Sequence, residues 1–239
     1  MGASERSQLL LAAAREAKGF MPDEEGVALS ALAGRVTRAG FSSIVEIGSY
    51  CGRSTLYLAS GVAGAMSPGA PPALIFSVDH HRGSEENQAG WEHHDETLVD
   101  EKTGLIDTLP FFRSAIHSAG AEDLVVAVVG DSASVAARWQ LEAGLVFVDG
   151  GHGEQPAWAD YMGWAPRVAL DGFLAIHDVF PEEKDGGRPP FEIYRRALLS
   201  GEFTEDLAAG RGSLRVLRRV SRADSPTSSP RGSDPPTNS

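Results

Sequence analysis

One stretch of this chain, FSSIVEIGSYCGRSTLYL at residues 41–58, constrains its fold more than any other. It opens with a β-branched run at residues 44–47, breaks at Gly48 and Gly52, and resumes with apolar residues at helical spacing. This order predicts a strand, a tight glycine turn and a helix. Glycine lets the backbone approach a ligand closely because it has no Cβ, and the unpaired N–H groups of the helix start face the same point. The stretch therefore predicts a small-molecule site at the turn.

The spacing of the glycines indicates the kind of ligand. A dinucleotide-binding turn carries G-x-G-x-x-G, whose middle glycine admits a pyrophosphate. Here the pattern is Glu46-x-Gly48-x-x-x-Gly52, with an acid on the strand and no middle glycine. A carboxylate beside the turn would repel a pyrophosphate and attract a cation. The pattern resembles the first motif of class I S-adenosylmethionine (SAM) methyltransferases, whose methyl donor carries a sulfonium and an ammonium group. An ordinary strand-to-helix turn is the alternative.

Composition limits the remaining classes of protein. A chain of 239 residues with 42% hydrophobic residues suits one domain, which we expect over residues 1–220, and the polar segment 221–239 is expected to be a disordered tail. The formal charge of −12 opposes binding to the phosphate backbone of nucleic acids. A single cysteine, Cys51, excludes an intrachain disulfide, and no signal-like start or long apolar run is present. We expect a cytoplasmic protein without membrane or nucleic-acid partners.

Short apolar runs alternate with helical stretches along the whole chain, and most of the runs end in a polar residue. Nearly continuous apolar runs are typical of strands buried on both faces of a parallel sheet, so the prediction is a doubly wound α/β fold. By its resemblance to class I methyltransferases, the sheet should have seven mostly parallel strands in a Rossmann-like arrangement. The remaining expected elements are two N-terminal helices, a helix before the fifth strand and a closing hairpin, at residues 5–17, 24–39, 154–168, 203–207 and 214–220.

Polar side chains at the carboxyl ends of the first three strands form the expected donor site. By the resemblance, Asp79 would bind the ribose hydroxyls of SAM, and Asp131 with Ser132 would lie near its adenine. Either aspartate alone is equally consistent with a helix N-cap or a solvated loop residue. The full set of expected cofactor-binding residues is Glu46, Gly48, Ser49, Gly52, Asp79, Asp131 and Ser132.

A second polar group follows the next two strands, in the sequences VDGGH and HD. Asp149, His177 and Asp178 offer two carboxylates and an imidazole, which suit a divalent cation. The spacing resembles that of metal-dependent sugar O-methyltransferases, which implies Mg²⁺ (or Mn²⁺) at these three residues and His152 as the general base. The sequence departs from that family at His177, where the family has an acid. The alternative is that the aspartates are caps or turn residues and no metal is used.

The polar segment from His80 to Asp95 contains four of the seven histidines, in the pairs His80-His81 and His93-His94. With only one cysteine in the chain, a structural zinc cluster is disfavoured. The segment is interpreted either as a mobile lid with glycine hinges or as a plain solvated loop.

The resulting hypothesis is a SAM- and metal-dependent O-methyltransferase that acts on a hydroxyl of a sugar or a sugar-containing natural product. The sequence resembles methyltransferases of macrolide sugars and the mycobacterial methylmannose polysaccharide 1-O-methyltransferases. The resemblance implies that the acceptor could be an oligosaccharide and the methylated group a mannoside 1-OH. A catechol-type O-methyltransferase, a non-catalytic SAM-binding protein and a nicotinamide oxidoreductase are the alternatives, the last disfavoured by the missing G-x-G-x-x-G. Nothing in the sequence decides whether the chain forms a homo-oligomer.

Overall fold

The structure is a computed structural model of the chain. It describes residues 2–67, 69, 71–88, 90–91, 93–151, 153–182 and 187–222. The expected tail at residues 221–239 therefore lies outside the described residues from residue 223 onward, and so does His152.

Seven strands form one sheet in the order β3-β2-β1-β4-β5-β7-β6. The first five pair in parallel, whereas β7 runs antiparallel to both β5 and β6. This topology confirms the prediction of a doubly wound, mostly parallel sheet with a closing hairpin. The strands are β1 Ser43–Ile47, β2 Leu74–Asp79, β3 Val125–Val129, β4 Ala143–Val148, β5 Val168–Ile176, β6 Phe203–Glu205 and β7 Arg215–Arg219.

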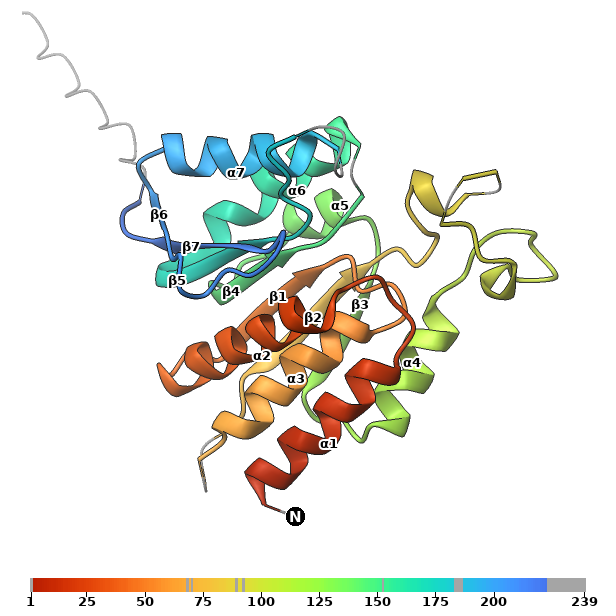
Figure 1. The fold of residues 1–239 in the computed structure, drawn as a ribbon, viewed down its shortest axis with the longest axis horizontal. Helices are drawn as coiled ribbons and strands as arrows, with labels where there is room; N and C mark the ends of the chain where they lie inside the picture. The colour runs from red at the N-terminus through yellow and green to blue at the C-terminus, as the bar shows by residue number, and fades with distance from the viewer. Residues whose placement is uncertain are drawn as a thin grey trace, which may run out of the picture.

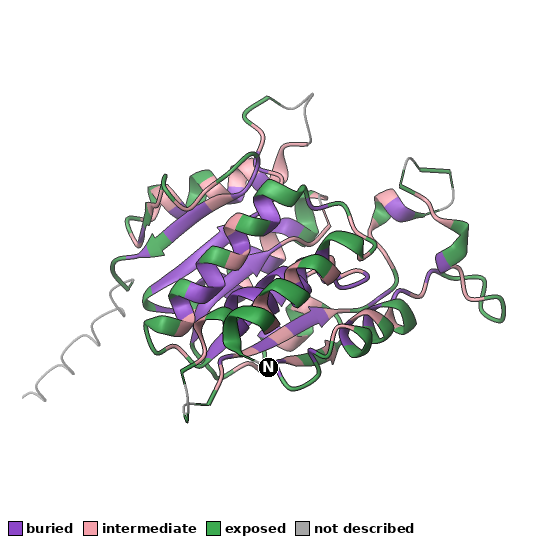
Figure 2. Cartoon of the chain, turned by 60° about the horizontal axis from the view of Figure 1, so that its bottom comes forward, coloured by how far each residue is buried: buried purple, intermediate pink, exposed green. Residues whose placement is uncertain are grey.

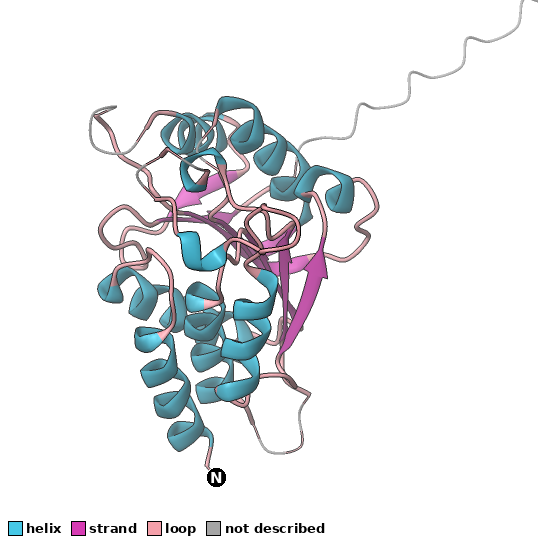
Figure 3. Cartoon of the chain, turned by 90° about the vertical axis from the view of Figure 1, so that its right-hand side faces the viewer, coloured by secondary structure: helices cyan, strands magenta, loops and turns pink. Residues whose placement is uncertain are grey.

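Helices cover both faces of the sheet. Helices α1 to α4 lie on one face and α5 to α7 on the other, with α1 packed on α3 (Figure 1). A side view shows the same layers, with helices on either side of the strands (Figure 3). The helices are α1 Ala3–Glu16, α2 Asp23–Arg38, α3 Arg53–Ala65, α4 Leu109–Ser118, α5 Ser132–Ala136, α6 Glu154–Trp164 and α7 Pro189–Leu199. Among the described residues, no helix is both long and apolar enough to cross a membrane.

The central strands are buried on both faces, so their alternating side chains enter two separate cores. Ile44 packs against the α1–α4 side, whereas its neighbour Val45 packs against the α5–α7 side. Strands β1 and β4 are buried along their whole length (Figure 2). Burial on both faces explains why these segments are continuous apolar runs rather than alternating ones. Because β1 and β4 pair in parallel, their carboxyl ends meet at the same edge of the sheet.

Helix α2 differs from its sequence pattern in one respect that matters for the site. The sequence suggests an apolar stripe that starts at Val27, but Val27 is 40% exposed. The buried stripe instead runs through Glu25, Leu29, Leu32 and Val36, at the spacing of one helix face. A carboxylate therefore lies in the core-facing stripe of α2, near the end of the helix that points toward the carboxyl ends of the strands.

The segment between β2 and α4 extends away from the sheet (Figure 1). Two 3₁₀ turns interrupt it, η1 at Glu85–Asn87 and η2 at Glu96–Leu98. The buried ring of His81 anchors its beginning, since His81 Nδ1 lies 2.7 Å from Thr108 Oγ1. This contact joins the two ends of the segment, and its role as a lid stays a prediction.

Candidate active site

The glycine turn between β1 and α3 lies directly beside the end of β4. Gly48 has φ +85, and a Cβ on it would overlap the backbone carbonyl of Asp149. Gly52, the N-cap residue of α3, has φ +97. Only glycine adopts these angles without strain, and only glycine leaves room for the neighbouring strand end. The turn is therefore held against the segment that carries Asp149.

Asp79, at the end of β2, holds this turn in place. Its Oδ2 accepts hydrogen bonds from the backbone N–H groups of Ser49 and Tyr50, at 2.9 and 2.8 Å, and its Oδ1 accepts one from His81 N at 2.7 Å. Backbone N–H donors to a carboxylate are charge-assisted and strong. The structure thus brings Asp79 and Ser49 together at the turn that Gly48 begins, and their contact with SAM stays a prediction.

Glu46 lies in a different place from the one expected for a cofactor ligand. Its side chain is fully buried, and it accepts hydrogen bonds from the hydroxyls of Ser54, Thr55 and Ser77, at 2.6, 2.5 and 2.7 Å. Because 46 and 44 share a strand face, the carboxyl group points beneath α3 rather than into the turn. Burial raises the pKa of Glu46 to about 7, against the lowering effect of the three hydroxyls. In this arrangement Glu46 joins β1, β2 and α3 below the site.

Asp131 and Ser132 both have structural partners. Asp131 is exposed and caps α5, with its Oδ2 accepting from Ser134 N at 2.8 Å. Ser132 Oγ accepts from the indole N–H of Trp164 at 2.8 Å. It also bonds to the buried carboxyl of Asp160, whose pKa burial raises to about 6. Asp131 is therefore a helix N-cap in this structure, which was the alternative to cofactor binding. Contact of Asp131 or Ser132 with adenine stays a prediction.

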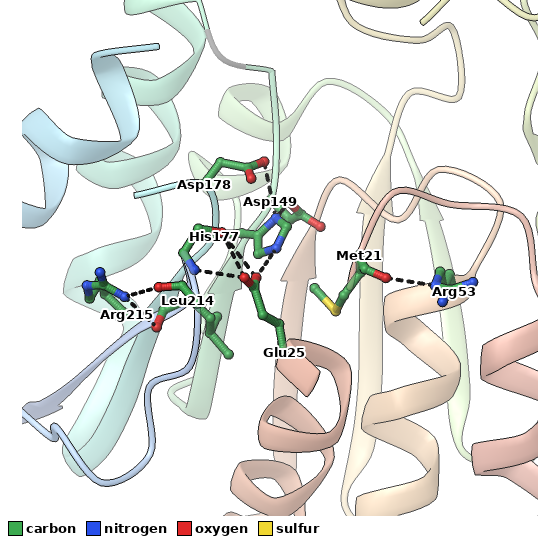
Figure 4. A network of polar contacts seen from close by, with 10 residues as sticks. Met21, Glu25, Arg53, Asp149, His177, Asp178, Leu214 and Arg215 are labelled. Carbon is green, nitrogen blue, oxygen red and sulfur yellow. Dashed lines mark hydrogen bonds and ion pairs between the residues drawn. The ribbon is translucent and has the colours of Figure 1, made fainter. Parts of the chain in front are cut away.

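Asp149, His177 and Asp178 come together where the adjacent strands β4 and β5 end (Figure 4). His177 Nδ1 lies 2.9 Å from Asp149 Oδ1 and 3.2 Å from Asp178 Oδ2. Asp178 has φ +54, an unfavourable angle for an aspartate, and this angle belongs to the turn that carries its carboxylate back to the ring. The histidine side chain is 5% exposed, whereas the two carboxylates are 20% and 24% exposed. The cluster therefore has a buried side and a solvent-facing side.

The other ring nitrogen of His177 also contacts a carboxylate. Nε2 lies 2.6 Å from Oε2 of Glu25, the buried acid of α2. Burial alone would lower the pKa of His177, but Asp149, Asp178 and Glu25 together raise it well above its usual value. Both ring nitrogens of His177 thus face carboxylates, and a ring protonated at both would donate a hydrogen bond on each side.

This donor set fits a divalent metal. One ligand atom from each of Asp149, His177 and Asp178 lies within 4.8 Å of the others, and the two carboxylates are partly exposed on the solvent-facing side. Two carboxylates and an imidazole are ligands that Mn²⁺ and related ions accept, with open positions for other oxygen ligands. The predicted base, His152, lies outside the described residues, so its role stays a prediction.

Glu25 was absent from the predicted site, although the sequence contains a signal for it. An ionised carboxylate is rarely buried unless it is paired, so an acid in register with Leu29, Leu32 and Val36 indicates a buried partner. Ser213, just before β7, is the other missed residue: its N–H donates to Glu25 Oε1 at 2.7 Å. Nothing in its local sequence distinguishes this serine from other loop serines.

A hollow lies beside the glycine turn, between the α1–α2 connection and the segment after β2. It has a volume of about 390 Å³. Its lining includes the rings of Phe20, Tyr50 and His93, and the ring centroid of Phe20 lies 5.3 Å from that of Tyr50 and 4.9 Å from that of His93. Lys18 and Asp95 add charged groups, paired with each other at 2.5 Å. The hollow thus offers ring faces and hydrogen-bonding groups next to the turn.

Solved structures share this architecture. An O-methyltransferase from Bacillus cereus in complex with SAH is 16% identical, with 92% of this chain and 90% of that chain covered and a TM-score of 0.56. CalS11, a TDP-rhamnose 3′-O-methyltransferase of calicheamicin biosynthesis, is 16% identical, with 90% and 92% covered and a TM-score of 0.58. A methyltransferase from Geobacter sulfurreducens is 14% identical, with 84% and 81% covered and a TM-score of 0.56. At these identities the likeness establishes the class I methyltransferase fold.

The family follows from the sequence match to a family model. The model described as "Methyltransferase domain" matches residues 45–179, from β1 to just past Asp178. The chain therefore belongs to this methyltransferase family, which confirms the predicted resemblance to class I SAM-dependent methyltransferases and the prediction that the chain is an enzyme.

Proposed function

We propose that this enzyme transfers the methyl group of SAM to a hydroxyl of a sugar or sugar-containing small molecule, assisted by a divalent metal. The observation that carries the proposal is the cluster of Asp149, His177 and Asp178 at the carboxyl ends of β4 and β5. In the reaction, the acceptor oxygen bonds to the methyl carbon as the carbon–sulfur bond breaks and a neutral thioether leaves.

The donor half of the proposal rests on the glycine turn. Ser49 and Tyr50 are held by Asp79, and the N-terminus of α3 faces the same place. We assign Gly48, Ser49, Gly52 and Asp79 to the donor site, with Glu46 supporting it from below. A donor site in this fold is supported by the Bacillus cereus O-methyltransferase, whose structure is a complex with SAH.

The acceptor half rests on the metal cluster. Asp149, His177 and Asp178 would hold the ion, and the two partly exposed carboxylates would leave it open to a substrate oxygen. The chemistry supplied by a divalent ion bound there would be stabilisation of negative charge on an acceptor oxygen that loses its proton. The protein's own contribution is to fix the three ligands on two adjacent, rigid strand ends.

A sugar is favoured as acceptor by two separate observations. The hollow beside Tyr50 combines ring faces with charged groups, and amphipathic rings of this kind suit a ligand that is apolar on its faces and polar at its edges. CalS11, which shares the fold, is a TDP-rhamnose 3′-O-methyltransferase. Sugar nucleotides, simple mannosides and oligosaccharides are therefore the acceptors to test first.

An acceptor screen with and without chelator tests the proposal. The enzyme would be given SAM with free and nucleotide-linked hexoses, methyl mannosides and a catechol, and methylated product would be measured by mass spectrometry. We expect turnover with a sugar that EDTA abolishes and that Mg²⁺ or Mn²⁺ restores, while calorimetry shows SAM binding unchanged by EDTA. Full activity in exhaustively chelated enzyme would refute the metal, and turnover with the catechol alone would refute the sugar.

The sequence-based assignment of His152 as base is part of the proposal and has its own test. A neutral imidazole near its usual pKa of about 6.5 can accept the acceptor's proton at physiological pH. We expect His152→Ala to lower kcat by about 10²–10⁴, with SAM and metal affinity nearly unchanged. A loss of metal affinity would make His152 a ligand instead, and a near-normal kcat would leave the base to be found.

A further inference from the structure

We propose that Glu25 is a positioning residue for the metal site, one that fixes Nε2 of His177 as a hydrogen-bond donor and so presents Nδ1 to an ion between Asp149 and Asp178. The inference rests on the proposed metal-dependent function and goes beyond it. It assigns a role to a residue of α2, which contributes nothing else to the cluster, and it predicts the kind of metal.

The first step is the geometry of the ring. Glu25 Oε2 lies 2.6 Å from Nε2, and Asp149 Oδ1 and Asp178 Oδ2 lie 2.9 and 3.2 Å from Nδ1 (Figure 4). The two nitrogens therefore face opposite partners, one in the protein interior and one at the solvent-facing carboxylates. A carboxylate accepts but does not donate, so Nε2 carries the hydrogen in that bond. When a metal occupies the cluster, Nδ1 is the nitrogen left with a lone pair directed at it.

The second step is that Glu25 itself is held rigidly. Ser213 N donates to Oε1 at 2.7 Å, and Ser213 Oγ lies 3.2 and 3.1 Å from Oε1 and Oε2. Gly212 has φ +51, and a Cβ there would overlap Oε1. The loop before β7 thus closes around the carboxylate from one side while α2 holds it from the other. A carboxylate with so many fixed partners can fix its histidine in turn, as the outer partners of metal-bound histidines do in other proteins.

The third step concerns the ion. A site of carboxylates alone suits Mg²⁺, whereas an imidazole nitrogen shifts the preference toward transition ions. With Nδ1 of His177 as a ligand, the site offers two carboxylates and one imidazole nitrogen to the ion. We therefore expect Mn²⁺ to bind more tightly than Mg²⁺.

Electron paramagnetic resonance of Mn²⁺ bound to the full-length protein tests this inference without any catalytic assay. The free-ion signal gives the dissociation constant, and spin-echo modulation from ¹⁴N reports a coordinated imidazole. We expect wild-type protein to show the ¹⁴N coupling, His177→Ala to lose it, and competition to show weaker binding of Mg²⁺. Glu25→Ala should weaken Mn²⁺ binding by about 10- to 100-fold and reduce the ¹⁴N coupling.

The chain offers a matched control and a conservative variant. Glu24 is the exposed neighbour of Glu25 on α2, so Glu24→Gln changes the charge of the same helix turn without touching His177. It should bind Mn²⁺ like the wild type. Glu25→Gln keeps one acceptor oxygen and should lose less affinity than Glu25→Ala, which a purely structural role would not predict. Should Glu25→Ala fail to fold by circular dichroism, Glu25→Gln and the wild-type coupling decide.

The outcomes separate this inference from the function on which it rests. Mn²⁺ binding without ¹⁴N coupling in the wild type, or unchanged affinity and coupling in the Glu25 variants, overturns the role of Glu25 and leaves the metal site standing. No Mn²⁺ binding by the wild type overturns both this inference and the metal part of the proposed function, while calorimetric SAM binding still reports on the donor site. Coupling that depends on Glu25 supports the inference.

Discussion

Two buried glutamates of this protein are stabilised in opposite ways. Glu25 pairs with His177 and with the N–H of Ser213, so its pKa lies below the usual value although burial would raise it. Glu46 has only hydroxyl partners, so burial outweighs them and its pKa rises to about 7. One acid is therefore kept charged for the site, whereas the other is protonated over part of the physiological pH range.

The raised pKa of Glu46 predicts a pH dependence of stability. An exposed glutamate titrates near 4.3, so the native state binds the extra proton between that pH and about 7. The stabilisation is complete below the unfolded pKa and is lost as pH rises through about 7. We expect the unfolding free energy of wild type, relative to Glu46→Gln, to fall by up to about 1.4 kcal/mol per pH unit in this window.

Urea unfolding of both proteins from pH 5 to pH 8 measures this difference. Glutamine keeps one acceptor oxygen, which can serve the hydroxyls of Thr55 and Ser77 that share Oε2 of Glu46. Its amide does not titrate, so pH effects that are common to both proteins cancel. A difference that stays constant across the range would show that Glu46 is ionised throughout.

Residues at strand ends could be predicted from the sequence, but their partners could not. Asp149 follows an apolar run directly and Asp178 follows one after His177, and their proximity follows from the parallel pairing of β4 with β5. Glu25 precedes β1 in the chain, and Ser213 lies in the loop before β7. Local residue spacing does not indicate which distant loop will pack against a helix. His152 was assigned from resemblance alone.

At the scale of single elements, the turn between β1 and α3 depends on backbone that lies unusually close to β4. Gly48 and Gly40 have nearly the same φ, +85 and +87. A Cβ on Gly48 would overlap the Asp149 carbonyl, whereas a Cβ on Gly40 would meet nothing within 4 Å. Substitution of Gly40 therefore measures the free-energy cost of the left-handed backbone alone. Substitution of Gly48 adds the cost of the steric overlap with the Asp149 carbonyl.

We expect Gly40→Ala to destabilise the protein by about 1–2 kcal/mol, the conformational cost alone. Gly48→Ala should cost more and should abolish SAM binding, because the turn and the Asp149 segment must move apart. Urea unfolding and calorimetry with SAM measure the two effects. Equal destabilisation, with SAM affinity retained in Gly48→Ala, would contradict the role assigned to this turn.

In two other elements, residues that usually mark a break in secondary structure lie inside a strand or a helix. The apolar run of the fifth strand is continuous only from Phe173 to Ile176, yet β5 begins at Val168 and contains the Asp171-Gly172 pair. Asp171 has φ +66, and the pairing of β4 with β5 shifts register here, so the pair marks an irregularity within a strand. Helix α7 begins with two prolines, which suit a first helical turn as well as a loop.

At the scale of the whole molecule, metal binding should couple to stability because the cluster is formed only in the fold. At a Mn²⁺ concentration of about 100 times the dissociation constant, we expect about 2.7 kcal/mol of added stability, or roughly 5–10 °C in Tm. The double variant Asp149→Asn/Asp178→Asn should show no such rise. Thermal unfolding with and without Mn²⁺ measures it, and an equal rise in both proteins would place the ion elsewhere.

The contact between Glu25 and Ser213 also orders events during synthesis. It joins residues 188 positions apart, and Ser213 follows His177 in the chain. At ordinary translation speeds, the interval between these two residues is on the order of seconds. During that interval the glycine turn and Asp79 have already left the decoding centre, while the acid behind His177 still lacks its serine. A nascent or prematurely released chain would thus have the residues of its donor half before its metal half is complete.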